Sequence, residues 1–181
     1  MQEDRLHQPP NPIQIKKEIF NYLKLAKTYA SLIGHKKWPF AQIQVECCYR
    51  ASAGLDDADS QYILGKRLLD EAVFRQNLQS DLIFDSESNT HRIIDLYKEA
   101  HGYLKSALGE KPIQAKRLLG LCYINGWGVN VNKDKGFDLI IESIEQENSW
   151  PRVQKVFAEI GINKSEFFSE LFMHRNRSDS H

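Results

Sequence analysis

Apolar residues recur at helical spacing along most of this chain. The first such stretch lies between Asn11-Pro12, a helix cap followed by proline, and Gly34. Its apolar residues keep the three-to-four spacing of one buried helix face, at Ile19, Leu23, Ala26, Ala30 and Ile33. No convincing strand pattern occurs elsewhere, so the sequence predicts an all-α fold of eight helices.

The remaining seven helices are predicted from the same spacing and from capping residues. Six of them form three antiparallel pairs, 39–54 with 57–74, 91–108 with 112–125, and 134–148 with 150–160. Asp56 or Asp57 can cap the helix after 56, and Asn132 or Asp134 the helix after 132. A last helix follows Asn163.

Two blocks of the sequence return downstream in the same register. Cys48 to Ala53 and Ser60 to Gly65 correspond to Tyr103 to Leu108 and Ala115 to Gly120. A third partial copy begins at Leu139-Ile140. Because a repeat of about 36 residues built from two helices buries its apolar faces only against neighbouring units, the pattern indicates a solenoid.

One stretch, 76–90, interrupts this regularity with Ser, Asp and Asn residues. The first unit exceeds the next by 19 residues, and the excess falls here. We therefore expect an inserted loop over 76–90, the least ordered internal segment. The predicted organisation is a disordered segment over 1–10, one solenoid domain over 11–173 and a flexible tail over 174–181. Its repeat-like units span about 41–75, 91–126 and 127–160.

The second unit carries a recognisable motif, Ala115-x-x-x-Leu119-Gly120-x-x-Tyr123-x-x-Gly126-x-Gly128-Val129, followed by Asn132, Lys135 and Gly136. This pattern resembles the Sel-one-like repeat, an α/α solenoid family related to tetratricopeptide repeats. The first unit keeps Ser60, Leu64 and Gly65 but has Leu68 and Glu71 at the tyrosine and glycine positions. The resemblance implies a short right-handed superhelix of antiparallel helix pairs, with capping helices at both ends.

These repeat positions have structural roles. Small residues such as Ala115, Ala107 and Gly120 lie where paired helices approach closely. Gly126 and Gly128 supply positive φ in a tight turn, which Tyr123 and Val129 fill. The rival interpretation of Gly126-x-Gly128 as a phosphate loop lacks a preceding strand and a third glycine.

Composition describes an ordinary soluble protein. The chain has 181 residues, 41% of them hydrophobic, and its mean hydropathy is -0.50. We see no segment apolar enough to cross a bilayer and no secretory signal. The three cysteines are an odd number and two are adjacent, which makes a disulfide framework improbable and favours the cytoplasm.

Charge is unevenly distributed although the net charge is zero. Residues 16–50 carry seven Lys or Arg against two acids, and residues 51–100 carry ten acids against five bases. A nucleic-acid binder usually shows a basic stripe over the whole domain. We therefore expect a polarised surface or a contact between the halves, with no nucleic-acid or membrane partner.

Four residues are candidates for binding a partner protein or peptide. Tyr62 and Arg117 occupy the same register in two first helices, and Lys66 lies one turn beyond Tyr62. Equivalent positions in successive units would line one groove. Trp127 occupies a variable site between two glycines, where it either packs against the insertion or serves as an exposed anchor.

No catalytic or metal-binding constellation is complete. The cysteines lack zinc-ligand spacing, and Cys47 and Cys122 are expected in the core. We expect no cofactor and no enzymatic activity. The resemblance implies a protein-binding adaptor, as in bacterial secretion or host-interaction assemblies. The alternatives are a cytosolic immunity or chaperone-like protein that masks a toxin or effector, and a hydrolase that uses Cys48 or a histidine.

Overall fold

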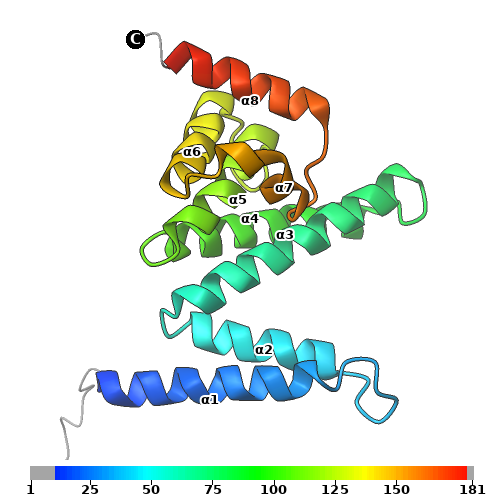
Figure 1. Cartoon of the computed structure of the whole chain (residues 1–181). Coiled ribbons are helices and arrows are strands. Elements are labelled where there is room, and N and C mark those ends of the chain that lie inside the picture. Colours follow the sequence, from blue (N-terminus) through cyan, green and yellow to red (C-terminus); the bar gives the residue numbers. More distant parts are fainter. Residues whose placement is uncertain (1–10, 179–181) are drawn as a thin grey trace, which may run out of the picture.

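The computed structural model describes residues 11–178, and within this range the chain forms helices and no strand (Figure 1). The all-α prediction and the number of eight α-helices are confirmed for these residues. The predicted disordered segment 1–10 and the last three residues of the predicted tail lie outside the described range. The elements are α1 (Pro12–Ala30), α2 (Ala41–Ala53), α3 (Ala58–Ser80), α4 (Glu87–Ala107), α5 (Pro112–Asn125), α6 (Lys133–Gln146), a 3-10 turn η1 (Trp150–Arg152), α7 (Val153–Ala158) and α8 (Ser165–Ser178).

Three helices begin at capping residues that the sequence predicted. The side chains of Asn11 and Asp57 accept hydrogen bonds from backbone N–H groups at the starts of α1 and α3. Asn132 Oδ1 accepts from Lys135 N at 3.0 Å at the start of α6. Each bond satisfies a donor that has no partner inside the helix. The boundary of α4 differs, because Ser86 caps it and the helix begins at Glu87, before the predicted start at residue 91.

Helices α2 to α6 each pair with the other neighbour in the chain from the one that the sequence predicted, as α3 does with α4 instead of α2. The most extensive packing joins α1 with α2, α3 with α4 and α5 with α6, and the predicted partners α2–α3 and α4–α5 touch less. The predicted units 41–75 and 91–126 therefore each combine halves of two neighbouring pairs. Figure 1 shows the pairs following one another from α1 at one end to α8 at the other.

Glycines explain this pairing. A Cβ atom at Gly65 would lie 2.7 Å from Leu104 Cγ and 3.2 Å from the Ala100 carbonyl oxygen, on α4. A Cβ at Gly120 would lie 2.7 Å from the Gly136 carbonyl oxygen on α6. Helix backbones approach this closely only where a side chain is absent. The repeat glycines therefore mark the contacts inside α3–α4 and α5–α6.

The core lies between these pairs and continues toward the C-terminus. The repeat positions Leu64 and Leu119 belong to it, Ala115 is buried as well, and Val129 packs against its edge. The turn after α5 has the predicted left-handed glycines, with φ of 74° at Gly126 and 69° at Gly128. The sequence therefore located the helix ends and the turn of this pair correctly.

The predicted inserted loop over 76–90 is wrong. Helix α3 continues to Ser80 and α4 already begins at Glu87, so only 81–86 connects them. The two helices have 23 and 21 residues, against 14 each in α5 and α6. The extra residues lengthen both helices into a projection, residues 74–93, which we call the arm and which Figure 1 shows extending from the body.

A buried amide holds the arm together. Asn89 is almost completely buried, and its Nδ2 donates to Gln79 Oε1 at 3.2 Å and to the Phe84 carbonyl oxygen at 3.1 Å. Its Oδ1 accepts from Arg75 Nη1 at 3.1 Å. The polar composition that indicated a loop thus forms a satisfied network between two helices.

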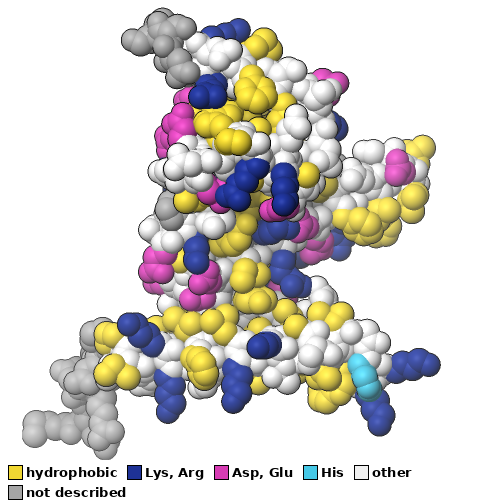
Figure 2. Space-filling model, in the orientation of Figure 1, with side chains coloured by type: hydrophobic (Ala, Val, Ile, Leu, Met, Phe, Trp, Pro, Cys, Tyr) yellow, Lys and Arg dark blue, Asp and Glu magenta, His cyan; other side chains and the backbone are white. Residues whose placement is uncertain are grey.

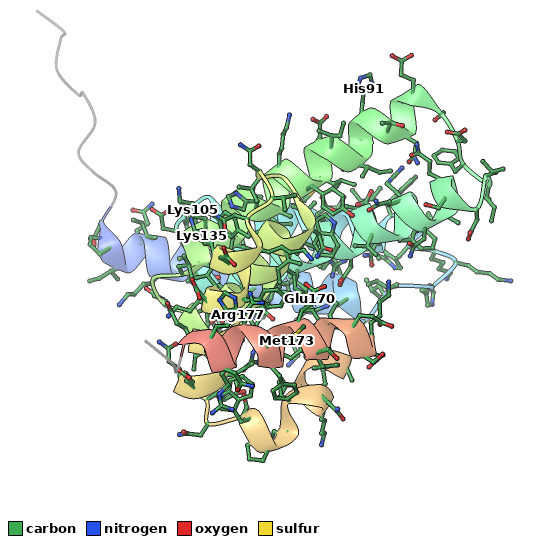
Figure 3. All side chains as sticks on the ribbon, turned by 90° about the horizontal axis from the view of Figure 1, so that it is seen from above. His91, Lys105, Lys135, Glu170, Met173 and Arg177 are labelled. Atoms are coloured by element: carbon green, nitrogen blue, oxygen red, sulfur yellow. The ribbon has the colours of Figure 1, made fainter. Side chains whose placement is uncertain are left out.

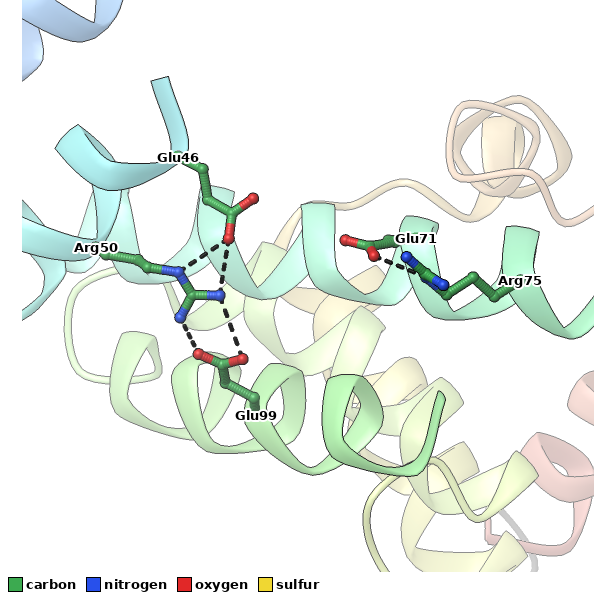
Figure 4. Close-up of polar contacts among 5 residues, drawn as sticks. All are labelled: Glu46, Arg50, Glu71, Arg75 and Glu99. Atoms are coloured by element: carbon green, nitrogen blue, oxygen red, sulfur yellow. Dashed lines mark hydrogen bonds and ion pairs between the residues drawn. The ribbon is translucent and has the colours of Figure 1, made fainter. Parts of the chain in front are cut away.

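An arginine bridges two successive helix pairs (Figure 4). Arg50 on α2 donates through both terminal nitrogens to the carboxylate of Glu99 on α4. Its Nε also donates to Glu46 Oε1, one turn earlier on α2, at 2.9 Å. This two-pronged contact fixes the orientation of the N-terminal pair against the α3–α4 pair, since a guanidinium and a carboxylate match in geometry.

The predicted flexible tail from residue 174 is wrong for its described part. Helix α8 continues through Ser178 and packs against α6, as Figure 3 shows from above. His174 Nε2 lies 2.8 Å from Asp138 Oδ1, and its ring lies 5.5 Å from that of Phe137. Lys133 Nζ adds an ion pair with Glu170 Oε2 at 2.9 Å.

Replacing Gly128 by alanine should destabilise the fold. A Cβ there would lie 2.2 Å from the Tyr97 carbonyl oxygen, and its φ is left-handed. We expect a loss of more than about 2 kcal/mol, from strain and from the displacement of α4. Gly102→Ala is the matched control, because it has open space and lies within α4; it should stabilise by about 0.5–1 kcal/mol. Equal denaturation midpoints for both variants would contradict this assignment.

Removing the amide of Asn89 should weaken the arm and the whole fold. Asn89→Ala leaves partners of three hydrogen bonds unsatisfied, at a cost of about 2–3 kcal/mol in the free energy of unfolding. The exposed neighbour Ser88→Ala serves as control and should change stability little. Urea denaturation measures both variants, and wild-type stability of Asn89→Ala would restore the inserted-loop interpretation.

Candidate functional site

Three of the four predicted binding residues lie near one another. Burial raises the pKa of Tyr62 on α3, while the nearby charges of Lys66 and Arg117 act in the opposite direction. Lys66 Nζ forms an ion pair with Asp70 Oδ2, one turn further along α3, at 2.8 Å. The side chains of Tyr62, Lys66 and Asp70 on α3 thus form one strip with Arg117 of α5.

Arg117 itself is a structural residue as much as a surface one. It is 8% exposed, and its Nη2 donates to Glu147 Oε2 just after the end of α6. Burial by itself would raise the pKa of Glu147, but the hydrogen bond and the charge of Arg117 hold this pKa below its ordinary value. Arg117 therefore links α5 to the end of α6, and a partner can reach little of its surface.

The strip leads into an apolar groove at the base of the arm. Asp70, the partner of Lys66, lines this groove together with Trp127. The cavity has a volume of about 320 Å³ and lies between α3, α5 and the segment after α7. We call it the α3–α5 groove, and its lining residues are Leu69, Asp70, Val73, Phe74, Asn77, Leu118, Leu121, Trp127, Ile160, Gly161 and Ile162.

Trp127 lies against α4 and lines the groove. Its indole stacks on the ring of Tyr97, with centroids 5.4 Å apart and planes 4° from parallel. The hydroxyl of Tyr97 donates to Gln76 Oε1 at 2.6 Å, and burial, followed by the neighbouring Cys122, raises the pKa of Tyr97 to about 12. A rigid stacked tryptophan offers a preformed apolar surface to a ligand.

Sequence reasoning missed the other apolar residues of the groove. Phe74 on α3 is 62% exposed although it follows the buried Leu69 and the partly buried Val73. Ile160 and Ile162, after α7, approach from the other side. The spacing of Leu69 and Val73 was a usable signal, but the segment around Ile160 is distant in the sequence and gave none.

The three cysteines differ in exposure. Cys48 is buried, Cys122 is fully buried and Cys47 is exposed, so the expectation of a core position for Cys47 is wrong. Burial, and after it the adjacent Cys47, raise the pKa of Cys48, and burial raises that of Cys122 to about 12. A nucleophilic cysteine needs the opposite shift. No hydrogen bond connects Cys48 to a histidine among the described residues.

His101 on α4 lies near two lysines, Lys105 of the same helix and Lys135 of α6. Burial, and then the charges of Lys105 and Lys135, lower the pKa of its imidazole; Figure 3 shows these two lysines lying close together. Its ring packs edge-on against Tyr123 at 5.7 Å. Lys135 Nζ donates to the Tyr123 hydroxyl oxygen at 2.8 Å, which ties α6 to α5.

Within residues 11–178, no cluster of three potential metal ligands occurs. None of the described helices combines the length and apolar character that crossing a bilayer requires. Comparison with protein-family models, with curated proteins and with solved structures found no match to this chain.

Thiol reactivity should distinguish the three cysteines. In the native protein at about pH 8, Ellman's reagent should modify Cys47 rapidly, and Cys48 and Cys122 at least about 100-fold more slowly, because both are buried and have raised pKa values. Unfolding in guanidinium should expose all three. In the Cys47→Ser control the fast phase should vanish. A fast native thiol remaining in that variant would revive a reactive Cys48.

Proposed function

We propose that this chain is a non-enzymatic adaptor that binds an apolar segment of a partner protein in the α3–α5 groove. The observation that carries the proposal is the groove itself, a concave apolar surface with an exposed Phe74 and a stacked Trp127. Large exposed apolar patches on a folded domain are typical of interaction sites. The expected cytoplasmic location is part of the same proposal.

The architecture supports this role if the helix pairs form a short α/α solenoid. The pairs α3–α4 and α5–α6 share the glycine register of the Sel-one-like pattern, with Gly65 and Gly120 each against the following helix. The pair α1–α2 and the helices α7 and α8 would then cap the two ends. Solenoids bind partners along surfaces to which successive units contribute, and the groove draws on α3 and α5 in this way.

The lining favours an amphipathic helix or extended peptide. Its side chains are apolar apart from Asp70 and Asn77, so it offers a hydrophobic surface with two polar groups that can orient a ligand. The cavity volume of about 320 Å³ suits a few large side chains of a partner helix. The carboxylate of Asp70, held by Lys66, lies where it can meet a partner's N–H groups or cation.

Among the four residues predicted from the sequence, Trp127 therefore becomes the central one. Lys66 lies at the rim of the groove, where it forms its ion pair with Asp70. Tyr62 lies further along the strip, near Arg117. The proposal adds Phe74, which is the more accessible of the two aromatic residues that line the groove. Aromatic side chains of this kind dominate the binding energy at protein interfaces.

Phe74→Asp should abolish partner capture while leaving the fold intact. The protein, tagged and expressed in its source organism, is recovered with its partners, which mass spectrometry quantifies. We expect at least about a tenfold lower recovery of the partner with Phe74→Asp, since a charge in the groove must be desolvated on binding.

Ile43→Asp provides the matched control, because Ile43 is a similarly exposed apolar residue on α2, outside the groove. Its partner recovery should equal that of the wild type, and circular dichroism should show equal helicity for both variants. Identical partner sets and amounts for wild type, Phe74→Asp and Ile43→Asp would refute the groove as the binding site.

A further inference from the structure

The outer face of α1 is both basic and apolar. Helix α1 packs against α2, and Ala26 is the one residue of this helix that is fully buried. The opposite face is exposed, with Ile13 at 77% and Phe20 at 65%. Between and beside these two lie four exposed lysines at three- or four-residue spacing. We call this face the plate; it consists of Ile13, Lys16, Lys17, Phe20, Lys24 and Lys27.

The charge of the plate is not balanced by neighbouring acids within the described residues. Residues 11–45 contain six lysines and Glu18 as their one acid. None of these lysines forms an ion pair with a described residue, while lysines elsewhere, such as Lys66 and Lys133, do. The segment after α1 extends the same character with exposed Lys36, Lys37 and Trp38. Figure 2 shows the basic side chains along the outer edge of α1.

The tip of the arm has the opposite charge and the same apolar character. Residues 81–87, which we call the arm tip, carry Asp81, Asp85 and Glu87 without any Lys or Arg. Leu82, Ile83 and Phe84 lie between these acids and are all exposed, with Leu82 at 78%. Figure 2 shows apolar side chains along the arm and at its end.

The backbone at the arm tip is held in an unfavourable conformation that presents these side chains. Leu82 has φ of 58°, in the left-handed region that a branched residue rarely adopts. The N–H groups of Ile83 and Phe84 both donate to the Leu78 carbonyl oxygen and fix this turn. Strain of this kind at an exposed apolar residue is a typical feature of a binding element.

We propose that the arm tip of one copy of this chain docks on the plate of a second copy. The two surfaces match in charge and in apolar character, and each leaves large apolar side chains in water when the chain is alone. Two plates cannot pair with each other, because four lysines would face four lysines. In the single chain the arm projects away from the body and α1 lies at its N-terminal end, so the contact forms between copies (Figure 1).

Such a contact is heterologous, because the surface that docks differs from the surface that receives it. Each copy offers one arm tip and one plate, so association proceeds through reciprocal pairs or head-to-tail chains. Attraction between the opposite charges accelerates the encounter and weakens as salt screens it, whereas the apolar contacts persist. Self-association should therefore weaken as the NaCl concentration rises.

Charge reversal at either surface tests the proposal by analytical ultracentrifugation at protein concentrations up to about 0.2 mM, the range in which small interfaces associate. The wild type should exceed the 21.0 kDa of a single chain. The variants Lys17→Glu/Lys24→Glu and Asp81→Lys/Asp85→Lys should each weaken self-association at least about tenfold. All four positions are exposed and their side chains lie outside the hydrogen-bond networks of the fold.

An equimolar mixture of the two variants is the decisive measurement. The plate of the first variant, with two lysines and two glutamates, has lost its net charge, and the arm tip of the second has become basic. The native arm tip of the first variant and the native plate of the second still match. The mixture should therefore recover association that each variant lacks alone. The control variant Lys155→Glu/Lys164→Glu makes the same change of net charge as Lys17→Glu/Lys24→Glu, at exposed positions outside the plate. It should associate like the wild type.

Three outcomes would overturn the proposal. A wild type that remains a single chain throughout this range has no such interface. Association that both variants retain uses another surface, and a mixture that fails to recover association shows that the two surfaces do not meet. A monomeric wild type that sediments with phosphatidylcholine vesicles containing phosphatidylserine, and loses this with Lys17→Glu/Lys24→Glu, would assign the plate to an anionic membrane instead.

Discussion

The close approach of paired helices at glycine determines how the rest of this chain packs. At Gly120 and Gly136, each backbone lies where the other helix would otherwise carry a side chain, and Gly65 repeats the arrangement against α4. Another glycine, Gly128 in the turn after α5, lies directly on the backbone of α4. Close backbone contacts at glycine thus fix both the helices within each pair and the position of one pair against the next.

The α3–α5 groove exists because the helices of the two glycine-packed pairs differ in length. Helices α3 and α4 exceed α5 and α6 by 9 and 7 residues, or roughly 10–13 Å of helix at 1.5 Å per residue. The additional turns extend past the end of α5 and have no further helix to cover them. Apolar residues of α3 such as Phe74 therefore remain accessible, and Trp127 and the segment around Ile160 form the other wall.

The sequence predicted local features well and relations between helices less well. Asn11, Asp57 and Asn132 act through hydrogen bonds to N–H groups two or three residues away, so residue type and position suffice to predict them. The phase of pairing depends on which of two neighbours a helix contacts more, and a repeat register is compatible with both. The repeat pattern predicted a close neighbour for Gly120 without showing which helix supplies it, and it did not predict the same contact at Gly65.

The errors at 76–90 and at Arg117 share a physical cause. Polar residues favour loops when they face water, but Asn89 finds three hydrogen-bond partners between two helices. Arg117 was predicted to line a binding groove because it shares the register of Tyr62, whereas Glu147, distant in the sequence, allows it to be buried. In both cases the partner comes from another helix, so local composition could not reveal it. The same limit applies to the groove, whose walls come from three separate segments.

The N-terminal pair differs from the rest in what its side chains contribute to the fold. Helix α1 buries one residue completely, and Arg50 on α2 supplies the polar link to Glu99 that joins this pair to the next. Burial of apolar surface is the main stabilising contribution to folding, so the outer residues Ile13 and Phe20 add little to stability. They lie among lysines that form no ion pair with a described residue, so this face offers two large apolar side chains and positive charge together. Side chains that neither stabilise the fold nor avoid water are best explained by a contact outside the single chain.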